Sequence, residues 1–209
     1  MVYDTNVDRF VVIWSTRASA ADDDDIKGVV LDIDPSDNSI DAGTTIDVQQ
    51  GTGDKGCRPQ FFQGRQIDFM TGRNKILYGA KVDRFDSGGN YLTGSGNSGI
   101  YIGILTAVGG STNSLTVNSM SRELTHHYCG GVAWDPTAVR GVITEQQSTL
   151  ADDLKIRVIE HDSSDDSITL GDAVEIADEC NTGSRSFAVP YYWAAAGRIS
   201  LIWTIGSSS

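Results

Sequence analysis

The stretch VVLDIDPSDNSIDAGTTIDV, from Val29 to Val48, recurs without a gap as RVIEHDSSDDSITLGDAVEI, from Arg157 to Ile176. In both copies an apolar run leads into a turn rich in Asp and Ser, followed by a glycine and a second run. Short apolar runs bounded by turn residues are typical of β-strands, so each copy predicts a β-hairpin. A fainter copy, ILTAVGGSTNSLTV from Ile104 to Val117, lies between them.

A different hairpin unit precedes each of these copies and occurs four times in all. Its runs are rich in Val, Ile, Tyr, Phe and Trp, and no window sustains apolar residues at helical spacing. The copies are VYDTNVDRFVVIWST (2–16), RPQFFQGRQIDFMTGRNKILYGA (58–80), GGVAWDPTAVRGVIT (130–144) and FAVPYYWAAAGRISLIWTI (187–205). One complete repeat therefore predicts four antiparallel strands.

Four basic residues mark the period of the repeat: Arg9, Lys75, Arg140 and Arg198. Radially repeated sheets of four antiparallel strands form a β-propeller, whereas a sandwich shows no such period and TIM or Rossmann folds need helices between strands. We therefore predict an all-β chain, residues 1–209 forming one partial propeller of about three and a half four-stranded blades. The predicted blades span 2–49, 57–121 and 128–178, and the half-blade spans 184–205.

A sheet that ends on two strands exposes an unpaired edge, which must be covered or will aggregate. Three arrangements would cover it here. The segment belongs to a longer chain, its last hairpin (Phe187–Ile205) pairs with strands of a partner, or a four-bladed ring closes by sharing the N-terminal strands. We therefore expect other protein chains that complete or flank the propeller.

Length and charge restrict the class of protein. A chain of 209 residues can bury a core without disulfides or a metal. The formal charge of -12 repels phosphate backbones and anionic membranes, and no apolar run approaches the roughly 20 residues of a membrane helix. We expect no nucleic-acid partner and no membrane insertion. The cysteines, Cys57, Cys129 and Cys180, are odd in number, so they do not indicate a redox compartment.

The repeated motif resembles the propeller repeats of phage tail and fibre proteins and of related bacterial surface proteins. The likeness is carried by the DPSDNSI or DSSDDSI turn, the glycine at Gly43 or Gly171, and the TTIDV or DAVEI strand. It covers nearly the whole chain but specifies a hairpin and no substrate. The resemblance implies a virion or extracellular location. Two enlarged loops in the second repeat depart from the pattern, and binding often occurs on such loops.

Aromatic residues provide one candidate ligand site. Tyr191, Tyr192 and Trp193 follow Pro190 at a predicted turn and could stack on a surface glycan. Trp14 and Trp203 lie at matched positions inside apolar strands, where we expect them to pack between blades. A carbohydrate-binding propeller lectin is therefore the alternative function, although the repeats differ at their aromatic positions.

Acidic turns provide the second candidate site. They group carboxylates as calcium sites do, and the candidate ligands are Asp32, Asp34, Asp37, Asp162 and Asp165. The glycine and the bidentate Glu of an EF-type loop are missing, and the alternative is that these side chains cap the turn backbone. No other cofactor is indicated, because the strings GTGDKG (51–56) and GSGNSG (94–99) lead into strands and not into the helix of a dinucleotide site.

We find no catalytic constellation. The sequence has no GxSxG motif, no evident carboxylate pair and no SxDxGxTW box of the sialidase type. His127 and Cys129 of the HHYC string (126–129) share a strand face, but a zinc site needs two more ligands. We predict a non-catalytic structural or recognition module of an extracellular or virion assembly, with a phage or viral tail or fibre component as the favoured assignment.

Overall fold

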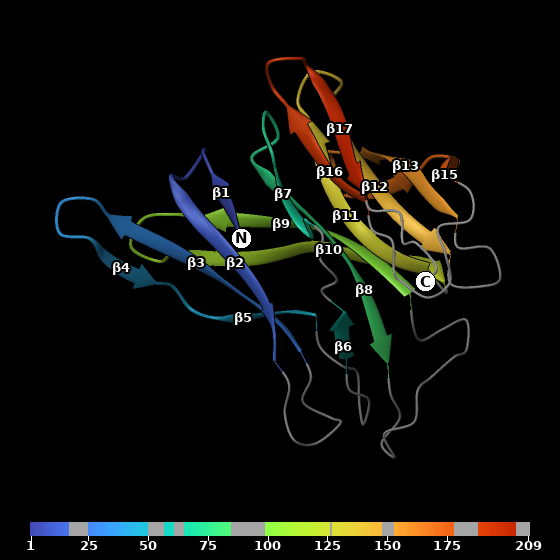
Figure 1. Ribbon diagram of the computed structural model, residues 1–209. Coiled ribbons are helices and arrows are strands. Elements are labelled where there is room, and N and C mark those ends of the chain that lie inside the picture. Colours follow the sequence, from blue (N-terminus) through green and yellow to red (C-terminus); the bar gives the residue numbers. More distant parts are fainter. Residues whose placement is uncertain are drawn as a thin grey trace, which may run out of the picture.

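The computed structural model describes residues 1–16, 25–49, 57–60, 65–84, 99–125, 127–147, 153–177 and 188–203. Within these ranges every regular element is a β-strand, and the strands pair antiparallel in sheets arranged like propeller blades (Figure 1). The predicted all-β fold class, with four-stranded antiparallel sheets in a propeller-like arrangement, is confirmed. No helix in the described part of the chain has the length and apolarity needed to cross a membrane.

Three sheets have four strand positions and one sheet has two. Blade 1 contains β1 (Val2–Asp4), β2 (Arg9–Ser15), β3 (Ile26–Asp34), β4 (Ser39–Ala42) and β5 (Ile46–Gln49). Blade 2 contains β6 (Cys57–Gln60), β7 (Ile67–Met70), β8 (Lys75–Arg84), β9 (Gly99–Val108) and β10 (Ser114–Thr125). Blade 3 contains β11 (His127–Asp135), β12 (Arg140–Gln147), β13 (Leu154–His161), β14 (Ile168–Leu170) and β15 (Val174–Ala177). The half-blade contains β16 (Ala188–Trp193) and β17 (Arg198–Trp203).

Some strand positions are filled by two short segments. In blade 1 both β4 and β5 pair with β3, and in blade 3 both β14 and β15 pair with β13. The breaks contain the repeated glycines: Gly43 N donates to Val30 O at 2.9 Å, and Gly171 N donates to Val158 O at 3.0 Å. The fourth strand therefore bends at the glycine while one hydrogen bond still ties it to the third strand.

Blade 2 is covered on both faces, and its side chains alternate between two hydrophobic clusters. Ile76 of β8 belongs to a cluster with Val11 of blade 1, whereas its neighbour Leu77 belongs to a cluster with Trp134 of blade 3. This alternation follows from the period of two along a strand. Because both faces are covered, residues 99–105 of β9 are all buried, which explains their uninterrupted apolar sequence.

The half-blade packs on blade 3, with β16 beside β11 and β12 (red and yellow in Figure 1). Its cluster is small and centres on Leu154 and Ala188. Thr144 Oγ1 also donates to Ala188 O at 2.6 Å. Among the described strands, β17 pairs only with β16, so one edge of this sheet is open.

Candidate functional site at the blade joints

Each complete blade presents a polar residue in a left-handed conformation at the turn between its third and fourth strands. These residues are Asn38, Asn113 and Asp166, with φ of 60°, 38° and 58°. Asn and Asp tolerate this backbone conformation better than other residues that carry a side chain. The repeat therefore places an amide or a carboxylate at the same point of every complete blade.

At the joint between blades 1 and 2, an arginine binds this turn residue. Arg9 Nη2 lies 2.8 Å from Asp32 Oδ2 of its own blade, and Arg9 Nε donates to Asn113 Oδ1 of blade 2 at 3.1 Å. The planar guanidinium can serve two acceptors at once. Arg9 thereby ties the second and third strands of blade 1 to the turn of blade 2.

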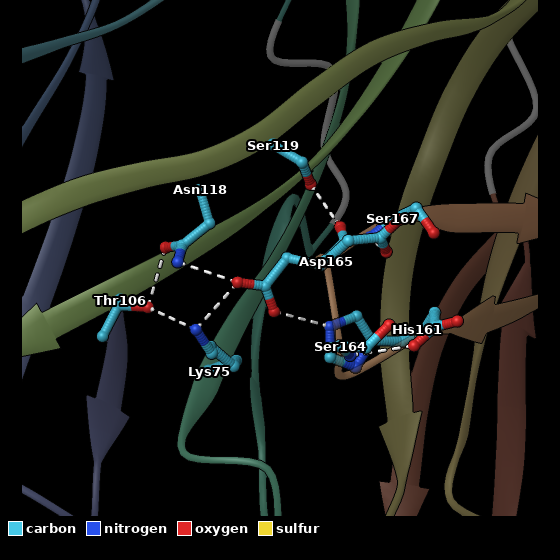
Figure 2. Close-up of polar contacts among 10 residues, drawn as sticks. Lys75, Thr106, Asn118, Ser119, His161, Ser164, Asp165 and Ser167 are labelled. Carbon is cyan, nitrogen blue, oxygen red and sulfur yellow. Dashed lines mark hydrogen bonds and ion pairs between the residues drawn. The ribbon is translucent and has the colours of Figure 1, made fainter.

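A lysine plays the same part between blades 2 and 3 (Figure 2). Lys75 Nζ lies 3.1 Å from Thr106 Oγ1 of its own blade and 2.9 Å from Asp166 Oδ2 of blade 3. Asn118 Nδ2 donates to the same carboxylate oxygen at 2.8 Å, and Ser119 Oγ donates to the Asp166 carbonyl oxygen at 2.6 Å. Three side chains of blade 2 thus converge on one residue of blade 3.

The carboxylate of Asp166 is held in its charged form. Burial is the largest single influence and by itself would raise its pKa. Hydrogen bonds from Lys75 and His161, the latter at 2.9 Å from Asp166 Oδ1, outweigh burial and keep the pKa of Asp166 below the usual value for Asp. A carboxylate engaged by several protein donors is suited to holding two blades together rather than to accepting a proton from a substrate.

Arg140 occupies the equivalent place in blade 3, but the sheet beyond it has only two strands. Arg140 Nη2 lies 3.1 Å from Glu160 Oε1, as Arg9 lies beside Asp32 in blade 1. The side chain of Arg140 is 59% exposed, whereas that of Arg9 is 18% exposed. The difference arises because no turn of a following blade covers Arg140 in the described part of the chain.

The predicted glycan-stacking residues lie together in β16 but do not share a face. The Tyr192 hydroxyl is 3.0 Å from Thr137 Oγ1, so Tyr192 faces blade 3. Tyr191 and Trp193 point the other way, because alternate residues of a strand share a face. Trp193 is 55% exposed. The structure therefore leaves two of the three aromatic residues on the free face of the half-blade.

The predicted calcium ligands contact protein groups. In four of them the carboxylate Oδ1 accepts a hydrogen bond from the backbone N of the serine two positions later, at 2.8–2.9 Å: Asp34, Asp37, Asp162 and Asp165. Hydrogen bonds from the side chain and the backbone of that serine lower the pKa of Asp34 and of Asp37, and those from the backbone and the side chain of Ser164 lower the pKa of Asp162. The fifth, Asp32, pairs with Arg9. Within the described ranges no three His, Cys, Asp or Glu side chains are grouped to hold a metal ion, and calcium binding stays a prediction.

The remaining sequence candidates form no site in the described residues. Cys129 is a free, fully buried thiol, and burial raises its pKa to about 12, so it behaves as a small apolar side chain. Trp134 is buried, and its Nε1 donates to Thr71 O of blade 2 at 3.2 Å. Several candidates lie wholly or largely outside the described residues: His126, Cys180 and both glycine-rich strings.

Asp68 and Glu145 are buried acidic residues that were not predicted from the sequence. Asp68 Oδ2 accepts a hydrogen bond from Trp134 N of the next blade at 2.7 Å, and burial raises the pKa of Asp68. Glu145 is buried, and its Oε1 accepts from Arg157 Nε at 2.8 Å. The only sequence signal is an acidic residue within an apolar strand, in IDFM and in VITEQ. That signal does not reveal the partner.

Comparison with known proteins leaves the function open. No protein-family model matches the chain, and no curated protein matches its sequence. Among solved structures it is similar to a protein from Lactobacillus plantarum determined by the Northeast Structural Genomics Consortium. The two share 9% identity over 96% of this chain and 68% of the other, with a TM-score of 0.32. The fold assignment therefore rests on the sheets themselves.

Proposed function

We propose that this chain is a non-catalytic structural or recognition module, a rigid part of a propeller that other polypeptide completes. The half-blade carries the proposal, because β17 has one strand neighbour in the described structure and its other edge is open. Unpaired N–H and C=O groups along such an edge are a template for pairing with another strand. The module thus has a built-in point of attachment.

The polar joints support a structural role. Their charged groups bind one another across the blades, as Lys75 and Asp166 do, and this restrains the sheets relative to each other. An open pocket on blade 1 is lined by Tyr3, Arg9 and Asp32, but Arg9 and Asp32 already form an ion pair there. A catalytic acid or base must reach its substrate, and these groups are engaged elsewhere.

The proposed setting is an extracellular or virion assembly, such as a phage tail or fibre. The resemblance of the repeats to those of tail, fibre and bacterial surface proteins supports this setting, and the net charge of -12 suits a solvated surface. Labelling of intact particles with an antibody against the chain tests it. Absence of the chain from the particle surface would exclude the virion setting.

Hydrogen exchange of the isolated chain tests the proposal of an open edge. The β17 amides that point away from β16 should exchange nearly as fast as unstructured amides, because no strand accepts their hydrogen bonds. They should become protected in the native assembly. A monodisperse monomer in which these amides are already protected would show that the chain itself pairs the outer edge of β17. That result would contradict the proposal.

A carbohydrate-binding module is the second candidate, favoured by the exposed indole of Trp193 beside Tyr191. Aromatic faces of this kind stack on sugar rings. A lectin should bind surface glycans on an array and lose that binding on Trp193→Ala, with Tyr192→Phe as a control on the opposite face. Absence of glycan binding by the wild-type chain would favour the structural module.

A further inference from the structure

Apolar residues that are covered in blade 1 have equivalents in blade 3 that are exposed. These exposed residues define an uncovered surface on blade 3. Val30 of β3 is fully buried, whereas Val158, its counterpart in β13, is 38% exposed. Ile46 of β5 packs against the cluster between blades 1 and 2, whereas its counterpart Val174 in β15 is 62% exposed. Both positions carry an apolar side chain in both repeats, so the surroundings cause the difference.

The polar residues of the same surface differ in the same direction. Glu160, which pairs with Arg140, has a side chain that is 56% exposed, and its counterpart Asp32 is 31% exposed. The space around the glycine that follows the hairpin differs between the two blades in the same way. A Cβ on Gly43 would lie 1.7 Å from Asn113 O of blade 2, whereas a Cβ on Gly171 would meet nothing nearer than 3.7 Å, all of it in its own blade.

The cover over blade 1 comes from the outer half of blade 2. Strand β10 contacts β3 and β5, Leu115 of β10 belongs to the same cluster as Val30, and the turn before β10 provides Asn113. Blade 3 has no such cover, because the half-blade supplies only its first two strands in the described structure. The exposed surface of Arg140, Val158 and Val174 therefore lies where the third and fourth strands of a following blade would pack.

We propose that this surface and the edge of β17 together bind a β-hairpin of a partner polypeptide. The first strand of the hairpin pairs antiparallel with β17, and apolar residues of its second strand cover Val158 and Val174. Its turn places an Asn or Asp in the left-handed conformation, where the side chain accepts a hydrogen bond from Arg140. The proposal rests on the proposed function and names the kind of partner that completes the blade.

One difference between the repeats restricts the size of a side chain in the partner hairpin. Leu115 lies over Gly28 in blade 1, where an added Cβ would be 2.6 Å from Leu115 Cδ2. The equivalent residue of blade 3 is Ile156. The partner hairpin therefore carries a smaller side chain than leucine at the position that faces Ile156.

A tethered hairpin tests the proposal on the whole chain. A second copy of residues 153–177, the third and fourth strands of blade 3, is appended after Ser209, so that residues 204–209 act as the linker. In this copy alanine replaces Ile168, the residue equivalent to Leu115, because that position faces Ile156. The tether raises the local concentration of the hairpin. We expect exchange of the outer β17 amides and of the β13 amides to slow by roughly tenfold or more.

Three variants distinguish specific docking from general stabilisation. Gly171→Ala should leave the unextended chain unchanged, because its Cβ meets only ordinary contacts there, but should abolish the added protection by clashing with the docked turn. Arg140→Ala should weaken the added protection as well, and so should alanine in place of the appended copy of Asp166. Val139→Asn serves as a neighbouring control that should preserve docking.

Three outcomes would overturn the proposed partner. They are no added protection in the extended chain, protection that is insensitive to both Gly171→Ala and Arg140→Ala, and dimerisation of the unextended chain with the same amides protected. The last outcome identifies a second copy as the occupant. A monomer whose β17 edge is protected without any extension contradicts the proposed function itself, so failure at the two levels can be told apart.

Discussion

At the scale of single residues, left-handed backbone positions shape the turns. Six residues other than glycine have positive φ in the described structure, and five of them are Asn or Asp. The exception is Val139, with φ of 56°, at the turn between the first two strands of blade 3. A β-branched residue in this conformation is strained, because its Cβ approaches the following carbonyl oxygen.

Val139→Asn should raise the free energy of unfolding by about 1 kcal/mol, because Asn relieves this strain. Val139 is already 43% exposed, so the change loses little packing. Urea unfolding followed by fluorescence measures the effect. The reverse substitution at the equivalent turn of blade 2, Asn74→Val, should be destabilising, and a stabilised Asn74→Val variant would contradict this explanation.

Gly43→Ala and Gly171→Ala form a matched pair at equivalent positions. Gly43→Ala should lower the free energy of unfolding by about 1–3 kcal/mol, because the new Cβ would overlap the Asn113 carbonyl oxygen. Gly171→Ala should change it little, because no turn lies over that position. Thermal unfolding of both variants compares them directly. An equal change in the free energy of unfolding for both variants would mean that the turn of blade 2 does not pack closely on Gly43.

At the scale of elements, the same contact recurs at both joints between complete blades. The first residue of a second strand binds a turn of the next blade. Arg9 and Lys75 each begin a second strand and bind the turn before the fourth strand of the following blade. This contact joins residues 104 positions apart at the first joint and 91 positions apart at the second. Adjacent sheets are therefore held by apolar packing over their faces and by polar contacts that include this repeated one.

Asp166→Asn tests the charge at the second joint. The folded-state pKa of Asp166 is lowered, so its contribution to stability is complete above the ordinary pKa of Asp, about 3.9, and is lost as pH falls through the lowered value. The variant should be less stable than wild type by about 1–3 kcal/mol at neutral pH. The difference should shrink on acidification. A difference that stays constant from neutral pH into the acid range would show that the charge is not responsible.

At the scale of the whole molecule, burial is uneven along the row of blades. Blade 2 is enclosed by neighbours on both faces, whereas the half-blade packs on blade 3 through a small cluster. Local stability follows the apolar surface that each element buries. The molecule should therefore open from its ends.

Native-state hydrogen exchange should show this gradient. The amides of β8 and β9 should be the slowest to exchange, and those of β16 and β17 the fastest among the hydrogen-bonded strands. Mass spectrometry of peptides from each blade measures the order. Equal protection of β9 and β16 would indicate that the half-blade is stabilised by contacts beyond those described.

Much of the fold could be predicted because strand alternation and turn chemistry are local properties. The repeat of DPSDNS as DSSDDS predicts the same hairpin twice, and the carboxylates at Asp34 and Asp162 do cap their turns. The breaks at Gly43 and Gly171 could not be predicted in the same way. Whether a glycine bends a strand depends on the ladder beside it.

The site at the joints could be predicted only in part. The spacing of Arg9, Lys75 and Arg140 marked them as repeated positions, but the sequence did not pair them with the turns of the next blade. The aromatic group of Tyr191, Tyr192 and Trp193 was predicted as one surface, and the structure divides it between two faces. A strand sends neighbouring side chains to opposite sides, and only packing decides which side is covered.

The sequence by itself determined the repeating hairpin, the number of blades it supplies and the residues that shape the turns, because these depend on contacts within a few positions of the chain. Only the tertiary structure decided which blade covers which. That order determines why Val30 is buried while Val158 is exposed, and why Arg9 has a partner in the next blade while Arg140 has none among the described residues. Burial is a property of neighbouring sheets, and equivalent repeats acquire different roles when one of them lies at the end of the row.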